Sequence, residues 1–199
     1  MSILKDCLEA KSTYKDKLEF NAFCVMDNHF HHLIQYRDGA HHLSSLMRHC
    51  HGIFGQRYNK LNNRSGKVAE SRPKTSLIEN IDHTMQVHMY IEANPIRAGK
   101  CKLNQLKLQK YCSYAFYAYG IKNEFTSLLT VPDWYIALGK NAIQRQIKYR
   151  QLFEQYLKES KLIKIEIMAK FIGSKIWVMN EIRRLREKTK EKTSKEAPD

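Results

Sequence analysis

LEFNAFCVMDNHFHHLIQY, residues 18–36, joins two runs of β-forming residues through a short polar turn. In the first run apolar residues recur at every second position, which is typical of a strand whose side chains alternate between two faces. Five side chains are expected to share one face: Leu18, Phe20, Ala22, Cys24 and Met26. Asp27-Asn28 supplies turn chemistry before the second run, residues 30–36. The stretch therefore predicts a β-hairpin.

Helices are predicted on both sides of this hairpin. Residues 2–16 carry apolar side chains at helical spacing, and residues 40–61 carry a longer apolar stripe. The Asn-Asn-Arg-Ser-Gly sequence at 62–66 is typical of a loop. Residues 67–78 favour a second extended pair, although Pro73 lacks a backbone donor and confines that pair to a sheet edge or a bulge.

A further helix is predicted from Asp82, a favourable N-cap, to Ala93, where Asn94-Pro95 ends it. The order of elements up to this point is helix, two strands, helix, one or two strands, helix. Such an order predicts an α+β fold in which helices pack on an antiparallel sheet.

The chain changes character near residue 121. Residues 141–158 and 161–188 are predicted to be helical and strongly basic, and residues 187–199 to be a disordered charged tail. The first of these helices is expected to present one apolar stripe: Ile143, Ile147, Leu152, Phe153, Tyr156 and Leu157. We therefore expect an α+β domain over residues 1–120 and a basic helical C-terminal region over residues 121–199.

The charge balance of the chain is unusual for a globular protein. Lys and Arg number 34 against 20 Asp and Glu, which gives a formal net charge of +14. Such an excess favours nucleic acid, because each phosphate that a cation neutralises releases a counterion. A solvated basic surface and a surface for acidic lipid are the alternatives.

The hydropathy of the chain and the spacing of its cysteines bear on where the protein is expected to work. No apolar stretch reaches the ~18 residues that a membrane span needs, so we expect no membrane partner. The N-terminal sequence lacks the apolar run of a signal peptide. The five cysteines show no Cys-x-x-Cys spacing, which favours reduced thiols in a cytoplasmic protein over a zinc site or a disulfide framework.

His29 and His31 stand two residues apart in the hairpin, so both imidazoles are expected on one face, with Phe30 on the other. Two neighbouring imidazoles form half of a site for a divalent cation, and partly exposed strand histidines are the alternative. Other nearby histidines have geometries that disagree with a single metal site. We interpret these as surface or DNA-facing residues: His32, His41, His42, His49 and His51.

Tyr90 and Asn94 are four residues apart on the helix predicted from Asp82, so they share one helix face. A phenol and an amide oxygen presented together could act as a nucleophile and a third metal ligand. The alternative is that Tyr90 is one of 11 tyrosines and is simply half-buried in a core.

Several segments resemble the single-tyrosine HUH transposases, most closely the branch called REP-associated tyrosine transposases. MDNHFHHLI at 26–34 is similar to the family's Met-Pro-Asn-His-hydrophobic-His strand. YIEANPIRAG at 90–99 is nearly the family's Tyr-Ile-Glu-x-Asn-Pro-Val-Arg-Ala-Gly segment. Shorter matches follow the same order at 64–66, 76–79 and 113–117, and the resemblance covers about residues 3–160.

The resemblance implies a ferredoxin/RRM-like HUH core that cleaves and rejoins single-stranded, hairpin-associated DNA. It implies that His29, His31 and Asn94 bind Mg²⁺ or Mn²⁺ and that Tyr90 attacks the scissile phosphodiester, leaving a 5′-phosphotyrosine and a free 3′-hydroxyl. Basic residues in these segments and in the C-terminal region are candidates for DNA binding: Arg64, Arg72, Lys74, Arg97, Arg145 and Lys148.

The sequence departs from the family at three places. The family usually begins with a strand that carries an Arg-Gly-Asn turn, whereas this sequence starts at the following helix, so we expect a missing first strand. The open sheet edge would then give either low stability or a homodimer formed through that edge. Residues 69–74 lack two aromatic residues of the family and include Pro73, and Asp27 replaces a proline. Two alternatives therefore stand beside a strand transferase: a truncated, catalytically inactive DNA-binding protein, and another HUH enzyme such as a relaxase or replication initiator.

Overall fold

The computed structural model describes residues 5–7, 17–36, 41–69, 73–159 and 170–195. Its centre is an antiparallel hairpin of β1 (Leu18–Val25) and β2 (Phe30–Tyr36). The Met26 N–H donates to the His29 carbonyl at 2.8 Å and closes the predicted Asp27-Asn28 turn. The α+β class and the small antiparallel sheet packed by helices are confirmed.

The predicted alternation along β1 holds only up to a bulge. Phe20 pairs with Ile34 and Ala22 pairs with Leu33, so Asn21 is an extra residue on β1. Since one extra residue exchanges the two faces of a strand, Phe20 packs in one core cluster and Ala22 in the other. The prediction that residues 18–26 share one face was therefore wrong beyond Phe20.

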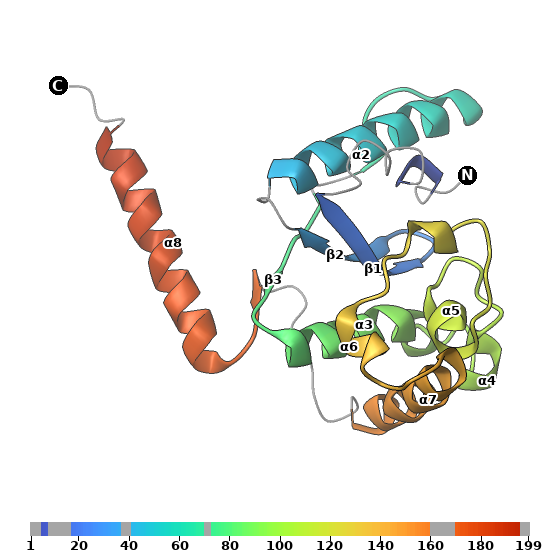
Figure 1. The fold of residues 1–199 in the computed structure, drawn as a ribbon. Helices are drawn as coiled ribbons and strands as arrows, with labels where there is room; N and C mark the ends of the chain where they lie inside the picture. The colour runs from blue at the N-terminus through green and yellow to red at the C-terminus, as the bar shows by residue number, and fades with distance from the viewer. Residues whose placement is uncertain (1–4, 8–16, 37–40, 70–72, 160–169, 196–199) are drawn as a thin grey trace.

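Each face of the hairpin is covered by one long helix (Figure 1). Helix α2 (His41–Leu61) covers the face that carries Phe20 and contributes Leu46 and Cys50 to that core, as its apolar stripe predicted. Helix α3 (Ile81–Arg97) covers the opposite face. The predicted helix at 2–16 lies largely outside the described residues, of which 5–7 are helical.

Helix α3 differs from its prediction at both ends. Its N-cap is Asn80, whose side-chain oxygen accepts from the His83 N–H at 3.1 Å, and Asp82 lies inside the first turn. The helix also continues through Pro95 to Arg97. Pro95 cannot donate to the Ile91 carbonyl, but the Asn94 side-chain amide donates to that carbonyl at 3.1 Å and takes over the missing hydrogen bond.

The predicted extended pair at 67–78 is wrong for the described residues of that range. Only β3 (Leu77–Ile78) is a strand, and it pairs in parallel with β4 (Phe171–Ile172). This partner lies inside the stretch predicted to be helical from 161. The pairing arises from contacts between distant segments, which local periodicity cannot reveal.

Helix α8 (Lys175–Lys195) follows β4 and projects away from the body of the molecule (Figure 1). The Glu79 carboxylate fixes its start, since it accepts from the Ser174 N–H at 2.5 Å and from the Ser174 hydroxyl at 3.0 Å. Residues 187–195 belong to this helix, which ends at Lys195, so the prediction of a disordered tail was wrong for these residues.

The described residues between α3 and β4 form short helices followed by one long helix. These are α4 (Leu103–Leu106), α5 (Tyr114–Tyr119), the 3₁₀ helix η2 (Thr126–Leu128), α6 (Asp133–Ile136) and α7 (Ala142–Glu159). Helix α7 packs on α3 and α5, and it buries Tyr149 and Phe153 in the core that also contains Tyr117. That core therefore extends across the predicted division at residue 120.

The apolar stripe predicted on α7 is only partly buried. Leu152, Phe153, Tyr156 and Leu157 pack in or against the core. Ile143 and Ile147 are 69% and 43% exposed, so the N-terminal half of that stripe faces solvent. Within the described residues no helix combines the length and the apolar character that crossing a membrane requires.

Candidate functional site

The hairpin places His29 and His31 side by side. Their ring centroids are 5.0 Å apart with the planes nearly perpendicular, and both rings lie on the side of the hairpin that faces α3. Phe30 and His32 lie on the opposite side, where the Phe30 ring contacts both His32 and His51. His29 and His31 therefore lie on one face of the hairpin, as their two-residue spacing predicted.

His32 is not the surface residue that was predicted. Both of its ring nitrogens are buried and have no hydrogen-bond partner among the described residues. Burial between Phe20 and Phe30 lowers the pKa of His32 to about 3, with a further contribution from neighbouring His31. This imidazole is neutral and packs as an aromatic ring beneath α2.

The electrostatic environment of the histidine pair suits metal binding. Burial, and secondarily the neighbouring His29, lowers the pKa of His31 to about 4, so His31 is a neutral imidazole near pH 7. His29 Nδ1 lies 2.7 Å from Asn28 Oδ1, which can only accept, so Nδ1 carries the proton. The lone pair on His29 Nε2 is then available to a ligand, as is usual for a metal-binding histidine held by a second hydrogen bond.

Tyr90 from α3 lies beside this pair. Its ring meets the ring of His31 edge-on, with centroids 6.1 Å apart, and it is half-buried. The Arg97 guanidinium lies over the Tyr90 ring at 4.8 Å from the centroid. Arg97 is seven residues after Tyr90, so the two share a helix face. The structure thus brings together a phenol, two imidazoles and a guanidinium.

Asn94 lies on the same helix, and its side-chain nitrogen is fully engaged. It donates to the carbonyls of Tyr90 and Ile91, both at 3.1 Å, and the residue is 8% exposed. Its carbonyl oxygen makes neither of these bonds and is the atom left for a ligand. Among the described residues no group of three or more His, Cys, Asp or Glu side chains could hold a metal. A cation held by the two imidazoles would therefore need further ligands of another kind, such as an amide oxygen, phosphate or water.

A buried polar network fixes α3 behind Tyr90. The Glu92 carboxylate is fully buried and accepts from the Ser113 hydroxyl at 2.5 Å and from the Tyr149 hydroxyl at 2.6 Å. Ser113 Oγ in turn accepts from the Phe23 N–H of β1 at 3.1 Å. Sequence analysis singled out no role for Glu92, although a carboxylate between Ile91 and Ala93 is a recognisable signal of a paired buried charge.

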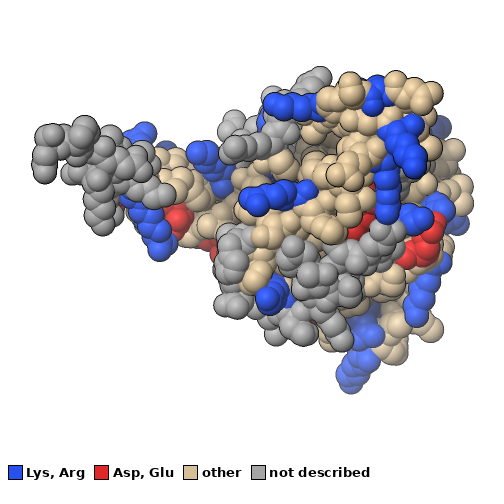
Figure 2. Space-filling model, turned by 90° about the horizontal axis from the view of Figure 1, so that it is seen from above, with Lys and Arg blue, Asp and Glu red and all other residues tan. Residues whose placement is uncertain are grey.

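The residues predicted to bind DNA are not gathered in one place. Arg97 is at the candidate site, whereas Arg64 follows α2 and lies over the Tyr58 ring at 5.6 Å from the centroid. Arg145 and Lys148 belong to α7, Lys74 is exposed, and Arg72 lies outside the described residues. Figure 2 shows Lys and Arg spread over the body and the projecting α8, with few acidic side chains on this face.

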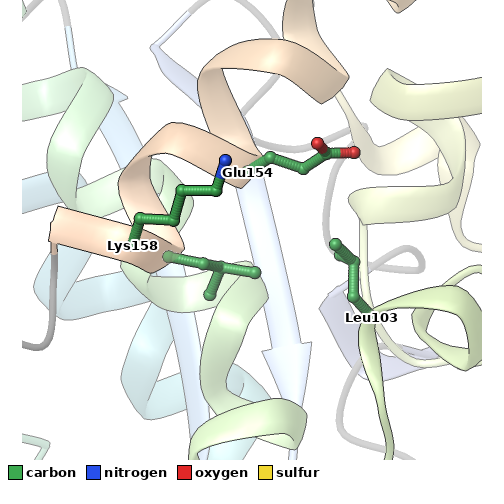
Figure 3. Close-up of a pocket in the computed structure, with 4 residues that line it drawn as sticks. Leu103, Glu154 and Lys158 are labelled. Atoms are coloured by element: carbon green, nitrogen blue, oxygen red, sulfur yellow. The ribbon is translucent and has the colours of Figure 1, made fainter.

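A pocket of about 290 Å³ lies between α4 and α7 (Figure 3). Its lining consists of Leu103, Glu154, Leu157 and Lys158. None of the predicted metal ligands or the predicted nucleophile lines this pocket. The candidate site is separate from this pocket and is formed by the half-buried His31 and Tyr90 together with the exposed His29 and Arg97.

Comparisons of the chain with protein-family models, with curated proteins and with solved structures found no match. Function is therefore inferred from the sequence motifs and from the geometry of the site alone.

Proposed function

We propose that the chain is a metal-dependent DNA strand transferase of the HUH single-tyrosine type. The observation that carries the proposal is the placement of Tyr90 against His31, with His29 on the same face, by elements far apart in the sequence. The excess of basic residues supports a nucleic-acid substrate. The single-stranded, hairpin-associated character of that DNA follows from the family resemblance.

The covalent step is a transesterification at a backbone phosphate. Tyr90 Oη forms a bond to phosphorus, and the bond from phosphorus to the 3′ oxygen breaks. The phenol loses its proton to solvent and the released 3′ oxygen takes one up, so the products are a 5′-phosphotyrosine and a free 3′-hydroxyl. Attack by a 3′-hydroxyl on the phosphotyrosine reverses the step and rejoins DNA without ATP.

The side chains at the site have distinct parts in this step. His29, His31 and the Asn94 oxygen would hold Mg²⁺ or Mn²⁺, which supplies positive charge to the phosphate oxygens when bound. Arg97 adds a fixed positive charge beside the Tyr90 ring. A free phenol is mostly protonated at neutral pH, since its ordinary pKa is about 10, so such a nucleophile needs this assistance.

A DNA-binding protein without catalysis is the second candidate. It is favoured by the engagement of the Asn94 amide nitrogen in α3, which gives that residue a structural role independent of any metal. Under this alternative the basic residues still bind DNA, but Tyr90 does not react.

The test is a denaturing gel of the protein incubated with labelled single-stranded hairpin DNA and Mn²⁺ or Mg²⁺. We expect a protease-sensitive shifted band that is lost in Tyr90→Phe, because this variant keeps the ring and removes only the hydroxyl. Tyr111→Phe, at a tyrosine that is 41% exposed, is the matched control and should keep the band. A band that persists in Tyr90→Phe places the nucleophile elsewhere, and DNA binding with no band in the parent supports the second candidate.

A further inference from the structure

Cys7 and Cys50 meet in the core cluster on the α2 side of the hairpin. Cys7 belongs to the helical residues 5–7, which lie beside α2 (Figure 1), and Cys50 is on α2 itself. The Cys7 thiol donates a hydrogen bond to the Cys50 sulfur, with the two sulfur atoms 3.5 Å apart, and both residues are fully buried. Two thiols from segments 43 residues apart in the sequence are therefore in direct contact.

A second contact holds Cys7 in this position. The fully buried Asp6 carboxylate pairs with the Arg57 guanidinium of α2. Arg57 is seven residues after Cys50, so the two side chains lie two turns apart on one face of α2. Residues 6 and 7 thus contact α2 at two points, which directs the Cys7 side chain toward Cys50.

The other three cysteines have different surroundings. Cys24 Sγ lies 3.9 Å from Met26 Sδ, and the Cys112 thiol donates to the Glu92 carbonyl at 3.6 Å. Cys101 is only partly buried. A buried thiol can serve simply as a small apolar side chain. At Cys7 and Cys50, however, closing the bond of about 2 Å that joins two sulfurs in a disulfide requires an approach of only ~1.5 Å.

We propose that Cys7 and Cys50 are an oxidative modification site, at which a peroxide converts the two thiols to a reversible disulfide. The Cys50 thiolate attacks a peroxide oxygen, so that an S–O bond forms, the O–O bond breaks and the released hydroxide takes up a proton. Cys7 then attacks the Cys50 sulfur, the S–S bond forms and the S–O bond breaks to release the second oxygen as water. The two thiols lose two electrons and two protons, and one peroxide becomes two waters.

The hydrogen bond assigns the order of attack. The thiolate is the reactive form of cysteine. The hydrogen bond from Cys7 lowers the pKa of Cys50, although burial and the Asp6 carboxylate oppose this effect. Cys50 is therefore the thiol that reacts with peroxide, and Cys7 is placed to resolve the product.

The disulfide would close a ring over residues 7–50, which contains the whole hairpin and the first half of α2. A cross-link of this length stabilises a protein mainly by restricting its unfolded chain. We expect the melting temperature to rise by about 5–15 °C on oxidation. The disulfide is independent of the proposed strand transfer, so its test does not depend on DNA or metal.

The test treats the folded, reduced chain with a few-fold excess of hydrogen peroxide, blocks the remaining thiols and digests the protein with trypsin without reductant. Cys7 and Cys50 fall in the tryptic peptides 6–11 and 49–57, each with a single cysteine. Mass spectrometry should find these two peptides joined, with the loss of two hydrogen atoms. Dithiothreitol should separate them and return the melting temperature, followed by circular dichroism, to that of the reduced chain.

Cys50→Ala and Cys101→Ala are the matched variants, each compared before and after oxidation so that the effect of the missing sulfur cancels. Oxidation should leave the melting temperature of Cys50→Ala unchanged and should raise that of Cys101→Ala as it does in the parent.

Three results would overturn the assignment. The first is oxidised Cys101 with peptides 6–11 and 49–57 still separate. The second is a disulfide between Cys24 and Cys112 instead, which face each other in an isolated β-bridge. The third is a link between Cys7 and Cys50 that forms only after the chain is unfolded in urea, since the folded arrangement would then not be its cause.

Discussion

Asn94→Ala, tested alone and together with Pro95→Ala, separates the structural role of Asn94 from its proposed role as a metal ligand. Pro95 has no N–H, so the Ile91 carbonyl inside α3 would lack a donor. The Asn94 side-chain nitrogen supplies one at 3.1 Å and also reaches the Tyr90 carbonyl at 3.1 Å. Removal of the amide therefore leaves a carbonyl unpaired within a buried helical turn.

The expected magnitude follows from this arrangement. An unpaired buried carbonyl costs about 1–3 kcal/mol, a large part of the roughly 5–15 kcal/mol that stabilises a domain. Pro95→Ala restores a backbone N–H at the position that donates to Ile91. Asn94→Ala should then cost less than about 1 kcal/mol in the Pro95→Ala background, which gives a coupling free energy on the order of 1–2 kcal/mol.

The measurement is guanidinium unfolding followed by circular dichroism, with a chelator present so that metal binding does not contribute. Equal denaturant slopes among the parent, the two single variants and the double variant would show that the unfolded states are comparable. If Asn94→Ala loses as much stability in the Pro95→Ala background as it does in the parent, the hydrogen bond to Ile91 is not the source of the loss and the reasoning fails.

The same double variant tests the proposed role of Asn94 as a metal ligand. Pro95→Ala restores the hydrogen bond to the Ile91 carbonyl, so the stability of Asn94→Ala should recover, but the Asn94 oxygen is still absent. We expect adduct formation to remain impaired and to require a higher Mn²⁺ concentration. Full recovery of adduct formation at the parental Mn²⁺ concentration would show that Asn94 serves the helix and not the metal.

Three further predictions follow from the same structure. His29→Ala or His31→Ala should abolish the adduct while hairpin-DNA affinity in a filter-binding assay stays within about threefold, whereas His32→Ala should keep the adduct because its ring lies on the α2 side; equal losses at all three positions would contradict the strand register. Affinity should fall linearly on a log–log plot against salt with a slope that indicates several phosphate contacts, and a flat plot would argue against nucleic acid. Burial raises the pKa values of Tyr117 and Tyr149 well above 10, so above about pH 10 the unfolded state holds fewer protons and stability should fall as pH rises; ionisation of all 11 tyrosines by absorbance while circular dichroism still shows a folded chain would refute this.

The elements that were predicted correctly are those whose signals are local. Asp27-Asn28 closes its turn through a single backbone hydrogen bond between Met26 and His29. The stripe on α2 needs only a helical period and one apolar face to pack against. The placement of His29 and His31 on one side follows from strand geometry alone.

The elements that were missed depend on partners distant in the sequence. At the β1 bulge, the Asn21 side chain donates to the Thr130 carbonyl and the Asn21 carbonyl accepts from the Tyr117 hydroxyl. Strand β3 exists because Phe171 and Ile172 lie beside it. No periodicity within residues 18–26 or 67–78 contains this information.

The sequence motifs suggest which residues form the candidate site, but they do not reveal the contacts that hold those residues in place. The motifs point to Tyr90 and the histidines. The hydrogen bonds of the buried Glu92, which no motif predicted, hold α3 against the hairpin. A buried carboxylate is a poor source of stability, because its desolvation offsets much of what its partners contribute. It does define orientation, since its two acceptor oxygens are satisfied only when Ser113 and Tyr149 approach together.

That orientation bears directly on Tyr90, which is two residues before Glu92 and therefore lies on the opposite side of α3. Ser113 ties the network to the Phe23 N–H of β1, in the hairpin that continues into His29 and His31. A rotation of α3 that moved the Tyr90 ring away from His31 would break the Glu92 hydrogen bonds on the other side of the helix. Because strand transfer would need the nucleophile held within a fraction of an ångström, a polar network that adds little stability but fixes helix rotation is suited to the function proposed for this site.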